Sequence, residues 1–239
     1  MNYRPALNMP PVVKNLILAN VLFYLITVVL RQTGTDLTGI LGLYFPASPN
    51  FRLHQVFTHM FMHDPSGFGH IFFNMFALYM FGRVLESVWG PKRFLTFYLV
   101  TGLGAAALHL FVIFLEYRHA LSGVSADQLA YLKEIAAQGK YIPGNTVSEI
   151  LTTPTIGASG AVFGILLGFG MLFPNTQLML LFPPIPIKAK YFVAGYGILE
   201  LIFGVSGIQG SVAHFAHLGG MLFGYFLIRY WNKNSRHFY

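Results

Sequence analysis

The sequence predicts an all-α, polytopic membrane protein whose single domain, residues 1–239, is a bundle of six membrane-spanning helices. Hydrophobic residues make up 55% of the chain and charged residues only 10%, whereas soluble domains carry about 25% charged residues. The mean hydropathy is +0.58, and six apolar stretches each have the roughly 17–25 residues that a helix needs to cross a bilayer. Most of the surface is therefore expected to face lipid.

The six stretches are bounded by turn residues and connecting segments. They cover residues 12–30, 68–89, 94–115, 155–173, 189–206 and 212–231. Pro91, Pro174 and the pair Pro183-Pro184 mark turns between successive spans. The first stretch is too long for the apolar core of a signal peptide, and it lacks a small-residue cleavage site, so we expect it to be a span.

Two of the connections are long. Residues 31–67 are rich in Gly, Pro, Phe and His. Residues 116–154 hold seven charged residues, which are Glu116, Arg118, Asp127, Lys133, Glu134, Lys140 and Glu149. Within the second connection, residues 126–138 have the composition of a short surface helix. We therefore expect a long first loop and an additional insertion between the third and fourth spans.

The basic residues predict the orientation of the bundle. With both termini on one side, ten of the fifteen lysines and arginines share that side: Arg4, Lys14, Arg83, Lys92, Arg93, Lys188, Lys190, Arg229, Lys233 and Arg236. The positive-inside rule then predicts cytoplasmic termini and places both long connections outside. Topology thus accounts for the net charge of +7, and no nucleic-acid partner is expected. The absence of cysteine excludes disulfides and thiolate metal sites.

Four polar side chains fall at one depth in this topology. His70, Asn74, Ser159 and His217 lie near the outer ends of the second, fourth and sixth spans. At about 1.5 Å per helical residue, all four are expected roughly 5–10 Å below the outer surface. Polar groups at membrane depth are costly and usually functional, so this layer predicts a site that opens outward.

Ser159 is the candidate nucleophile. Gly157 and Gly160 flank it at a helix start, where free backbone N–H groups are available. We assign such oxyanion-binding donors to Gly157 and Ala158. A serine in a membrane helix also occurs simply as a packing residue, and the sequence of this one helix leaves that alternative open.

His217 is the candidate base. Gly220 and Gly224 lie on its helix face, at i+3 and i+7, and can press against Gly160 and Gly164 of the serine helix. Such close backbones would bring the imidazole within hydrogen-bonding reach of the hydroxyl. A histidine in a span can also serve as a purely structural hydrogen-bonding group.

The third member of a catalytic triad is not evident. His214 lies one turn before His217 and competes for the role of base, although it is closer to the water boundary. Glu200 is a carboxylate in the middle of the fifth span, and we expect it to bond polar groups near Gln209. We therefore predict a two-residue dyad.

His70 and Asn74 share one helix face at i and i+4. Side-chain donors at that spacing can supplement the backbone N–H groups around a developing oxyanion. Hydrogen bonding between helices is the structural alternative.

With these motifs the chain resembles the rhomboid family of intramembrane serine proteases over residues 12–231. Ser159 matches the family's G-x-S-G serine, and His217 matches the histidine of its A-H-x-x-G-x-x-x-G pattern. His70 and Asn74 match the H-x-x-x-N oxyanion residues. Further resemblances are His59 and His63 to two histidines of the first loop, and Glu86 to a structural glutamate of the second span.

Three features depart from the family pattern. His54-Gln55 stand where the first loop often carries Trp-Arg. Phe163 stands where a tyrosine often stacks on the base, and a phenyl ring can hold an imidazole in the same way. The insertion at 116–154 is unusually long, and the sequence assigns it no role.

Other classes of protein remain possible from the sequence. His59, His63 and His70 could ligate a metal without cysteine, which would make this a metal-binding membrane protein. An inert relative would bind client helices without cleaving them. Glu200 could belong to a transporter, where intramembrane carboxylates relay protons.

The resemblance implies a serine endopeptidase that needs no cofactor and no metal. Its substrates would be transmembrane proteins within the lipid bilayer. The expected location is the bacterial inner membrane, with the active site opening to the external face. The oligomeric state is not predicted.

Overall fold

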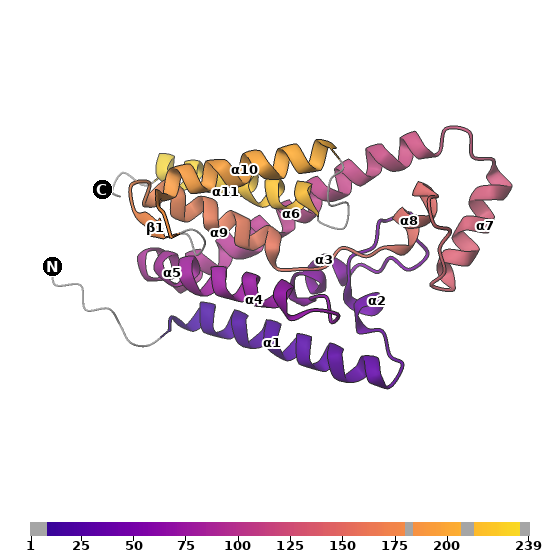
Figure 1. Cartoon of the computed structure of the whole chain (residues 1–239), viewed down its shortest axis with the longest axis horizontal. Helices are drawn as coiled ribbons and strands as arrows, with labels where there is room; N and C mark the ends of the chain where they lie inside the picture. Colours follow the sequence, from indigo (N-terminus) through magenta and orange to yellow (C-terminus); the bar gives the residue numbers. More distant parts are fainter. Residues whose placement is uncertain (1–8, 180–183, 207–212, 235–239) are drawn as a thin grey trace.

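The computed structural model describes residues 9–179, 184–206 and 213–234. The helices of this part are α1 (Pro11–Gln32), α2 (Leu37–Leu41), α3 (Gln55–Thr58), η1 (His59–Phe61), α4 (Phe68–Ala77), η2 (Leu78–Gly82), α5 (Arg83–Trp89), α6 (Pro91–Ala120), α7 (Ala126–Ala137), α8 (Thr146–Thr152), α9 (Ser159–Leu172), α10 (Ala189–Ser206) and α11 (His214–Asn234). The strands are β1 (Gln177–Met179) and β2 (Pro186–Lys188). The long helices lie side by side, and α7 and α8 lie at the end opposite to the start of α1 (Figure 1).

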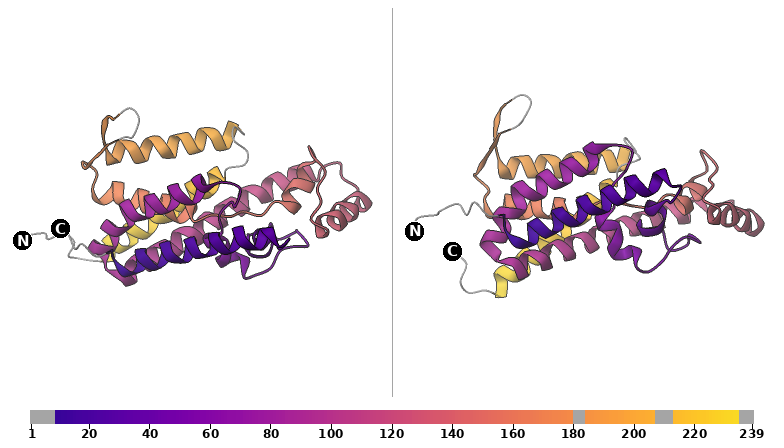
Figure 2. Two further views of the ribbon diagram at one scale, coloured as in Figure 1. Left: turned by 60° about the horizontal axis from the view of Figure 1, so that its bottom comes forward. Right: turned by 90° about the horizontal axis from the view of Figure 1, so that it is seen from below.

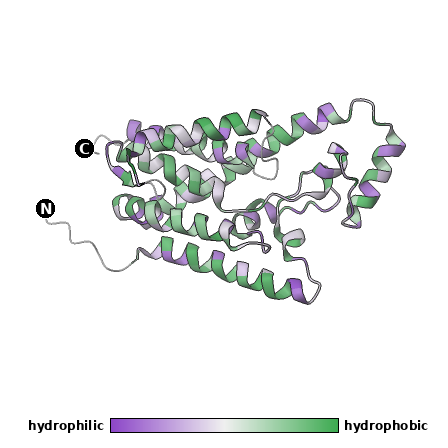
Figure 3. Cartoon of the chain, in the orientation of Figure 1, coloured by the Kyte–Doolittle hydropathy of each residue, from purple (hydrophilic) through white to green (hydrophobic). Residues whose placement is uncertain are grey.

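The bundle belongs to an integral membrane protein. Within the described residues, four helical stretches are long and apolar enough to cross a bilayer: α1, the continuous run α4–η2–α5, α6 and α10. They correspond to the predicted first, second, third and fifth spans. Hydrophobic residues cover most of α1 and α10 (Figure 3), and their exposed leucine, isoleucine and valine side chains present an outward face suited to lipid. The count of six spans stays a prediction.

The fourth span was predicted at residues 155–173, with a helix start at the glycines around Ser159, and the helix begins there rather than at residue 155. Residues 153–158 are not helical, and the backbone of Thr155 pairs with that of Leu43. Pro154 disfavours helical backbone at the residue before it, and Gly157 has a φ of 127°, which a right-handed helix cannot contain. The helix therefore starts only at Ser159 and has 14 residues.

A short antiparallel hairpin joins α9 to α10, with Leu178 opposite Ile187. The sequence reading missed these two strands because Pro183-Pro184 and Pro186 indicated only a turn. The hairpin is small beside the helices, so the all-α prediction is confirmed for the architecture as a whole.

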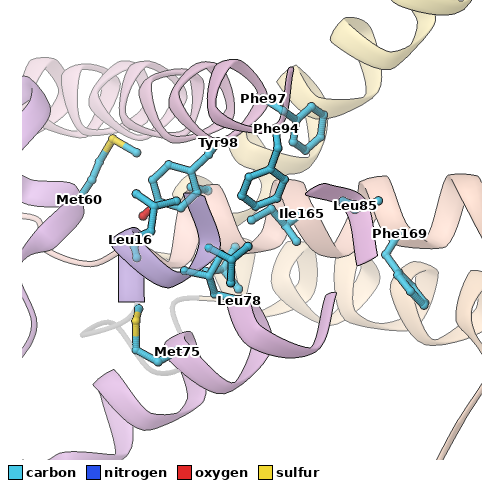
Figure 4. Close-up of a cluster of buried hydrophobic side chains, with 14 of the residues drawn as sticks. Leu16, Met60, Met75, Leu78, Leu85, Phe94, Phe97, Tyr98, Ile165 and Phe169 are labelled. Carbon is cyan, nitrogen blue, oxygen red and sulfur yellow. The ribbon is translucent and has the colours of Figure 1, made fainter. Parts of the chain in front are cut away.

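The core of the bundle forms where α6, α9 and α11 meet, since α11 packs most extensively against α6 and α9. Large buried side chains fill the interior of the bundle, as Figure 4 shows for Phe94, Phe97, Tyr98 and Ile165. Where α6, α9 and α11 cross one another, glycines stand in place of large side chains. A side chain at Gly164 would collide with the side chain of Thr101 of α6, so α6 and α9 approach closely because this position has no side chain.

Glu86 fixes the start of α1. Its two carboxylate oxygens accept hydrogen bonds from the backbone N–H groups of Val12 and Val13, at 2.9 and 2.8 Å. These N–H groups have no partner within the helix, and a carboxylate also complements the positive end of the helix dipole. The carboxylate thus has a structural task between the first and second spans.

The insertion folds as a compact unit rather than as an open loop. Helix α7 lies within one residue of the helix predicted at 126–138, and a reciprocal capping box between Ser125 and Gln128 starts it. Helix α8 was not predicted, and α6 continues to Ala120 beyond the expected end of the third span. Figure 2 shows this unit projecting from one end of the bundle, with α10 at one edge of the helical layer.

Candidate active site

Ser159 is the first residue of α9, at the end of the extended approach from Thr153. The N–H groups of a first helical turn have no partners within the helix, so this end of α9 offers donors and the positive pole of its dipole. A helix of 14 residues is only about 21 Å long at about 1.5 Å per residue. The extended approach therefore lets Ser159 lie deeper in the bundle than four residues of helix would.

The hydroxyl of Ser159 meets the imidazole of His217. The Oγ atom lies 2.8 Å from Nε2, the geometry in which the hydroxyl donates to an unprotonated ring nitrogen. The contact that the sequence predicted between the two helices is therefore present. His217 is only 8% exposed, so bulk water has little access to the ring.

Glycine contacts produce this distance. A side chain at Gly220 of α11 would collide with the carbonyl oxygen of Gly160, and one at Gly224 would lie 3.5 Å from the Cα atom of Gly164. The glycine faces of α9 and α11 are thus pressed together, as their spacing predicted. Larger residues would push the helices apart and separate the serine from the histidine.

Phe163 stacks on the base. Its ring centroid lies 4.1 Å from that of His217, and the two planes differ by only 5°. The phenyl ring therefore fixes the imidazole plane that presents Nε2 to the hydroxyl. Tyr196 of α10 contacts the same phenyl ring, at 6.1 Å between centroids.

His70 lies on the other side of the serine. A Cβ atom built on Gly157 would be 3.2 Å from Nε2 of His70 and 3.5 Å from the Ser159 hydroxyl, so the missing side chain leaves the space between them open. The Asp64 N–H donates a long bond of 3.4 Å to Nδ1 of His70. With Nδ1 as acceptor, neutral His70 carries its proton on Nε2, toward this space.

The backbone and amide donors differ from the prediction in one respect. The N–H of Gly157 donates to the carbonyl oxygen of His59 at 3.0 Å, so it is engaged away from Ser159. The assignment of Gly157 as an oxyanion donor was therefore wrong, because the loop carbonyl competes for its proton. Asn74 is buried, and one N–H of its amide donates to the carbonyl oxygen of His70 at 2.8 Å.

The prediction that no carboxylate reaches the base was also wrong. Oε2 of Glu200 lies 2.6 Å from Nδ1 of His214 and 2.9 Å from Nδ1 of His217. Gln209, the partner region expected for Glu200, lies outside the described residues. This contact could not be predicted from the sequence, because α10 and α11 approach each other only in the tertiary structure.

The first-loop histidines do not join in a metal site. Among the described residues, the group with the spacing of metal ligands is Glu200, His214 and His217, not the alternative set of His59, His63 and His70. Nδ1 of His59 lies 2.9 Å from the carbonyl oxygen of Gln55, one turn earlier. The ring of His63 packs against that of His70 at a tilt of 59°, with 5.0 Å between the ring centroids.

Gln55 anchors the first loop, and His63 is buried within it. The amide of Gln55, at one of the departures from the family pattern, bonds backbone groups of Tyr44, Arg52, Ile40 and Asn50. His63 is fully buried, and desolvation lowers its pKa to about 4, so it is neutral at physiological pH. The loop that supplies His59 is therefore held by buried polar contacts.

Comparison with known proteins agrees with this architecture. Residues 50–233 match the rhomboid domain family. The chain is 35% identical over 171 residues to RHOMBOID-like protein 12, mitochondrial, of Arabidopsis thaliana. This alignment covers 71% of this chain and 44% of that protein. It is 27% identical over 161 residues to Rhomboid protein 1, mitochondrial, of Saccharomyces cerevisiae, covering 66% and 36% of the two chains.

A bacterial relative is also similar. Rhomboid protease AarA of Providencia stuartii is 27% identical over 162 residues, covering 65% of this chain and 48% of the relative. The matches span less than half the length of each of these curated relatives. Because the domain match covers most of the chain and includes the helices that carry Ser159 and His217, the chain belongs to the rhomboid family.

Proposed function

We propose that this protein is an intramembrane serine endopeptidase that uses Ser159 as nucleophile and His217 as general base. The observation that carries the proposal is the 2.8 Å contact between Oγ and Nε2 at a helix start. A packing serine has no need of a buried imidazole held in plane by Phe163. An inert relative that only binds client helices would not require this contact.

The proposed reaction is acyl transfer to serine followed by hydrolysis. Ser159 Oγ attacks the scissile carbonyl carbon while Nε2 of His217 takes the hydroxyl proton, and the imidazolium then protonates the leaving amine. Water attacks the resulting ester by the same route in reverse. Release of the second product restores the free hydroxyl.

The negative charge that develops on the carbonyl oxygen needs donors. We assign them to the N–H groups of Ala158 and Ser159 and to Nε2–H of His70, which borders the space left by Gly157. Asn74 keeps a second amide N–H after bonding the His70 carbonyl, and we assign this proton to the same oxygen. Gly157 donates no hydrogen bond here, but its missing side chain leaves room for the carbonyl oxygen between His70 and Ser159.

The proposed substrates are transmembrane helices of other proteins. A helix hides its carbonyl carbons within its own hydrogen bonds, so a substrate must unwind locally before attack. Basic-residue placement supports cytoplasmic termini and a site that opens on the external side. The bacterial inner membrane stays a prediction, since the relatives include mitochondrial and bacterial proteins.

The test is covalent labelling of the purified protein in detergent with a fluorophosphonate probe. We expect one label, at Ser159, and cleavage of a model transmembrane substrate by the same preparation. Ser159→Ala should abolish both, and His217→Ala should reduce both nearly as far, because members of a catalytic unit are non-additive. Ser206→Ala, at an exposed serine of α10, is the matched control and should label normally.

Two results would contradict the proposal. One is substrate cleavage that persists undiminished in Ser159→Ala. The other is wild-type protein that is folded in detergent but neither accepts the probe nor cleaves any transmembrane substrate.

A further inference from the structure

We propose that Glu200 is a positioning residue that orients His217 and stabilises its protonated form, which makes the catalytic unit a Ser–His–Glu triad. This inference rests on the proposed protease function. The carboxylate comes from α10, a different helix from either dyad member. Its Oε2 atom is 2.9 Å from Nδ1 of His217, on the ring edge opposite the serine.

Burial makes this proximity consequential. Glu200, His214 and His217 are 9%, 5% and 8% exposed. A carboxylate out of water needs compensating donors, and here both donors available on α11 are imidazoles. Of these, His214 makes the well-aligned bond, with Nδ1 at 2.6 Å.

The tautomer of His217 follows from the two contacts on its ring. Nε2 must be unprotonated to receive the Ser159 proton, so the neutral ring carries its hydrogen on Nδ1. A carboxylate oxygen beside Nδ1 favours that tautomer and opposes the inverted one. In this conformation the N–H direction departs from a straight bond to Oε2, so the present contact is electrostatic rather than a well-formed hydrogen bond.

Proton transfer would strengthen the contact. When Nε2 accepts the serine proton, the ring becomes a cation next to a carboxylate within a poorly hydrated site, where opposite charges attract more strongly than in water. No proton need move to Glu200. His214 keeps the carboxylate in place while His217 is neutral.

The distances favour hydrogen bonding over a metal ion. Zinc binds imidazole nitrogen and carboxylate oxygen at about 2.0–2.2 Å in tetrahedral geometry, which sets ligand atoms well over 3 Å apart. The separations of 2.6 and 2.9 Å are shorter and belong to directly interacting groups. Within the part of the chain that the structure describes, the same three residues would otherwise be the metal candidate.

The test compares Glu200→Gln, Glu200→Asp and His214→Gln in steady-state cleavage of a transmembrane substrate. We expect Glu200→Gln to lower kcat by about 10²-fold or more with KM nearly unchanged, since amidation of the equivalent carboxylate in a serine protease costs up to about 10⁴. Glu200→Asp keeps the charge and should recover at least tenfold of that loss. Glu86→Gln, at the buried structural carboxylate of α5, should lower thermal stability but not kcat per labelled site.

The comparison with His214 separates two roles for Glu200, which are orienting His217 and merely holding α10 against α11. If Glu200 only held the two helices together, Glu200→Gln and His214→Gln would lower kcat equally. The triad instead predicts a loss of kcat at least fivefold smaller in His214→Gln. Equal losses, or wild-type kcat in Glu200→Gln, would overturn the inference. Loss of wild-type activity on adding 1,10-phenanthroline would overturn it too, because it would assign the three residues to a metal.

A second measurement applies if Glu200→Gln does not fold. Nitrogen-15 NMR of histidine-labelled wild-type protein, with His217 assigned from a His217→Gln difference spectrum, should show a protonated Nδ1 and an unprotonated Nε2. The inverted tautomer would overturn the inference. Failure of the protease proposal is distinguishable, because it would leave wild-type Ser159 unlabelled whatever residue stands at position 200.

Discussion

The contact between α9 and α11 at the candidate active site and the core of the insertion are built by different means. Where α9 meets α11, the contact is made by Gly160 and Gly220, so backbone lies on backbone. In the insertion, α7 and α8 form a second core of buried side chains with the first loop and the end of α6: Phe45, Tyr117, Leu132, Ala136, Val147 and Leu151. Close approach of α9 and α11 thus depends on the absence of side chains at these glycines, whereas the insertion is held by packed side chains.

The solvent explains this difference. In lipid, apolar side chains gain little by leaving their surroundings, so helices associate through close packing and interhelical hydrogen bonds. The insertion is expected in water, where burying apolar surface is worth about 25 cal/mol per Å². Its helices accordingly begin with water-facing caps, from Ser125 in α7 and Asn145 in α8.

The two regions meet near the active site. Ser48 of the first loop donates to the carbonyl oxygen of Leu151, and Asn50 donates to that of Ala136. The pairing of Leu43 with Thr155 then leads into the extended approach to Ser159. The first loop is thus bonded both to the insertion and to the segment that carries the serine.

The largest effect is expected from Gly220→Leu, which would break the backbone contact in the bundle. A side chain there must displace the Gly160 carbonyl, and overpacking of this kind costs about 1–3 kcal/mol or more. We expect cleavage and probe labelling to fall at least a hundredfold through separation of the dyad. Gly195→Leu is the matched control, since space is open around Gly195 in α10. Equal activity of the two variants would contradict the account.

His70→Ala should have the next largest effect. Loss of one oxyanion donor typically lowers kcat by about 10²–10³-fold. Because other donors remain, we expect a loss of kcat near the lower end of this range. Asn74→Ala should be milder, because its amide is shared with the His70 carbonyl. Unchanged kcat in both variants, with the proteins folded in detergent, would remove them from the oxyanion site.

Leu132→Ala should damage the insertion alone. Emptying a buried leucine site costs about 2–5 kcal/mol, so we expect faster proteolysis or hydrogen exchange within residues 121–152. Cleavage by the bundle should stay within threefold of the wild type. Tyr131→Ala, at an exposed neighbour, should change neither property. A large loss of labelling at Ser159 in Leu132→Ala would show that the insertion shapes the site.

The smallest effect is a pH dependence of stability carried by His63. Its pKa is about 4 in the folded protein, below the ordinary value of 6.5, so the unfolded chain binds more protons between these values. The contribution of His63 to stability is therefore present above pH 6.5 and declines as the pH falls from 6.5 to about 4. Thermal unfolding of His63→Gln should depend less steeply on pH in this window than that of the wild type. An equally steep pH dependence in His63→Gln would show that other groups cause the pH dependence of stability.

Much of the fold follows from local sequence. Hydropathy over single helices predicted the spans that the structure shows as α1, α4–α5, α6 and α10, and composition predicted α7. The glycines flanking Ser159 and following His217 predicted that their helices meet. Each of these signals lies within one element, where spacing along a helix fixes which residues share a face.

Only the tertiary structure decided the remaining contacts. It placed Glu200 beside His217, directed the Gly157 N–H to His59, and made the approach to Ser159 extended. These features depend on how separate elements are positioned. The spacing of residues along one helix does not determine how α10 is rotated relative to α11. The sequence by itself thus determined which residues carry the candidate chemistry, and packing decided which carboxylate completes it.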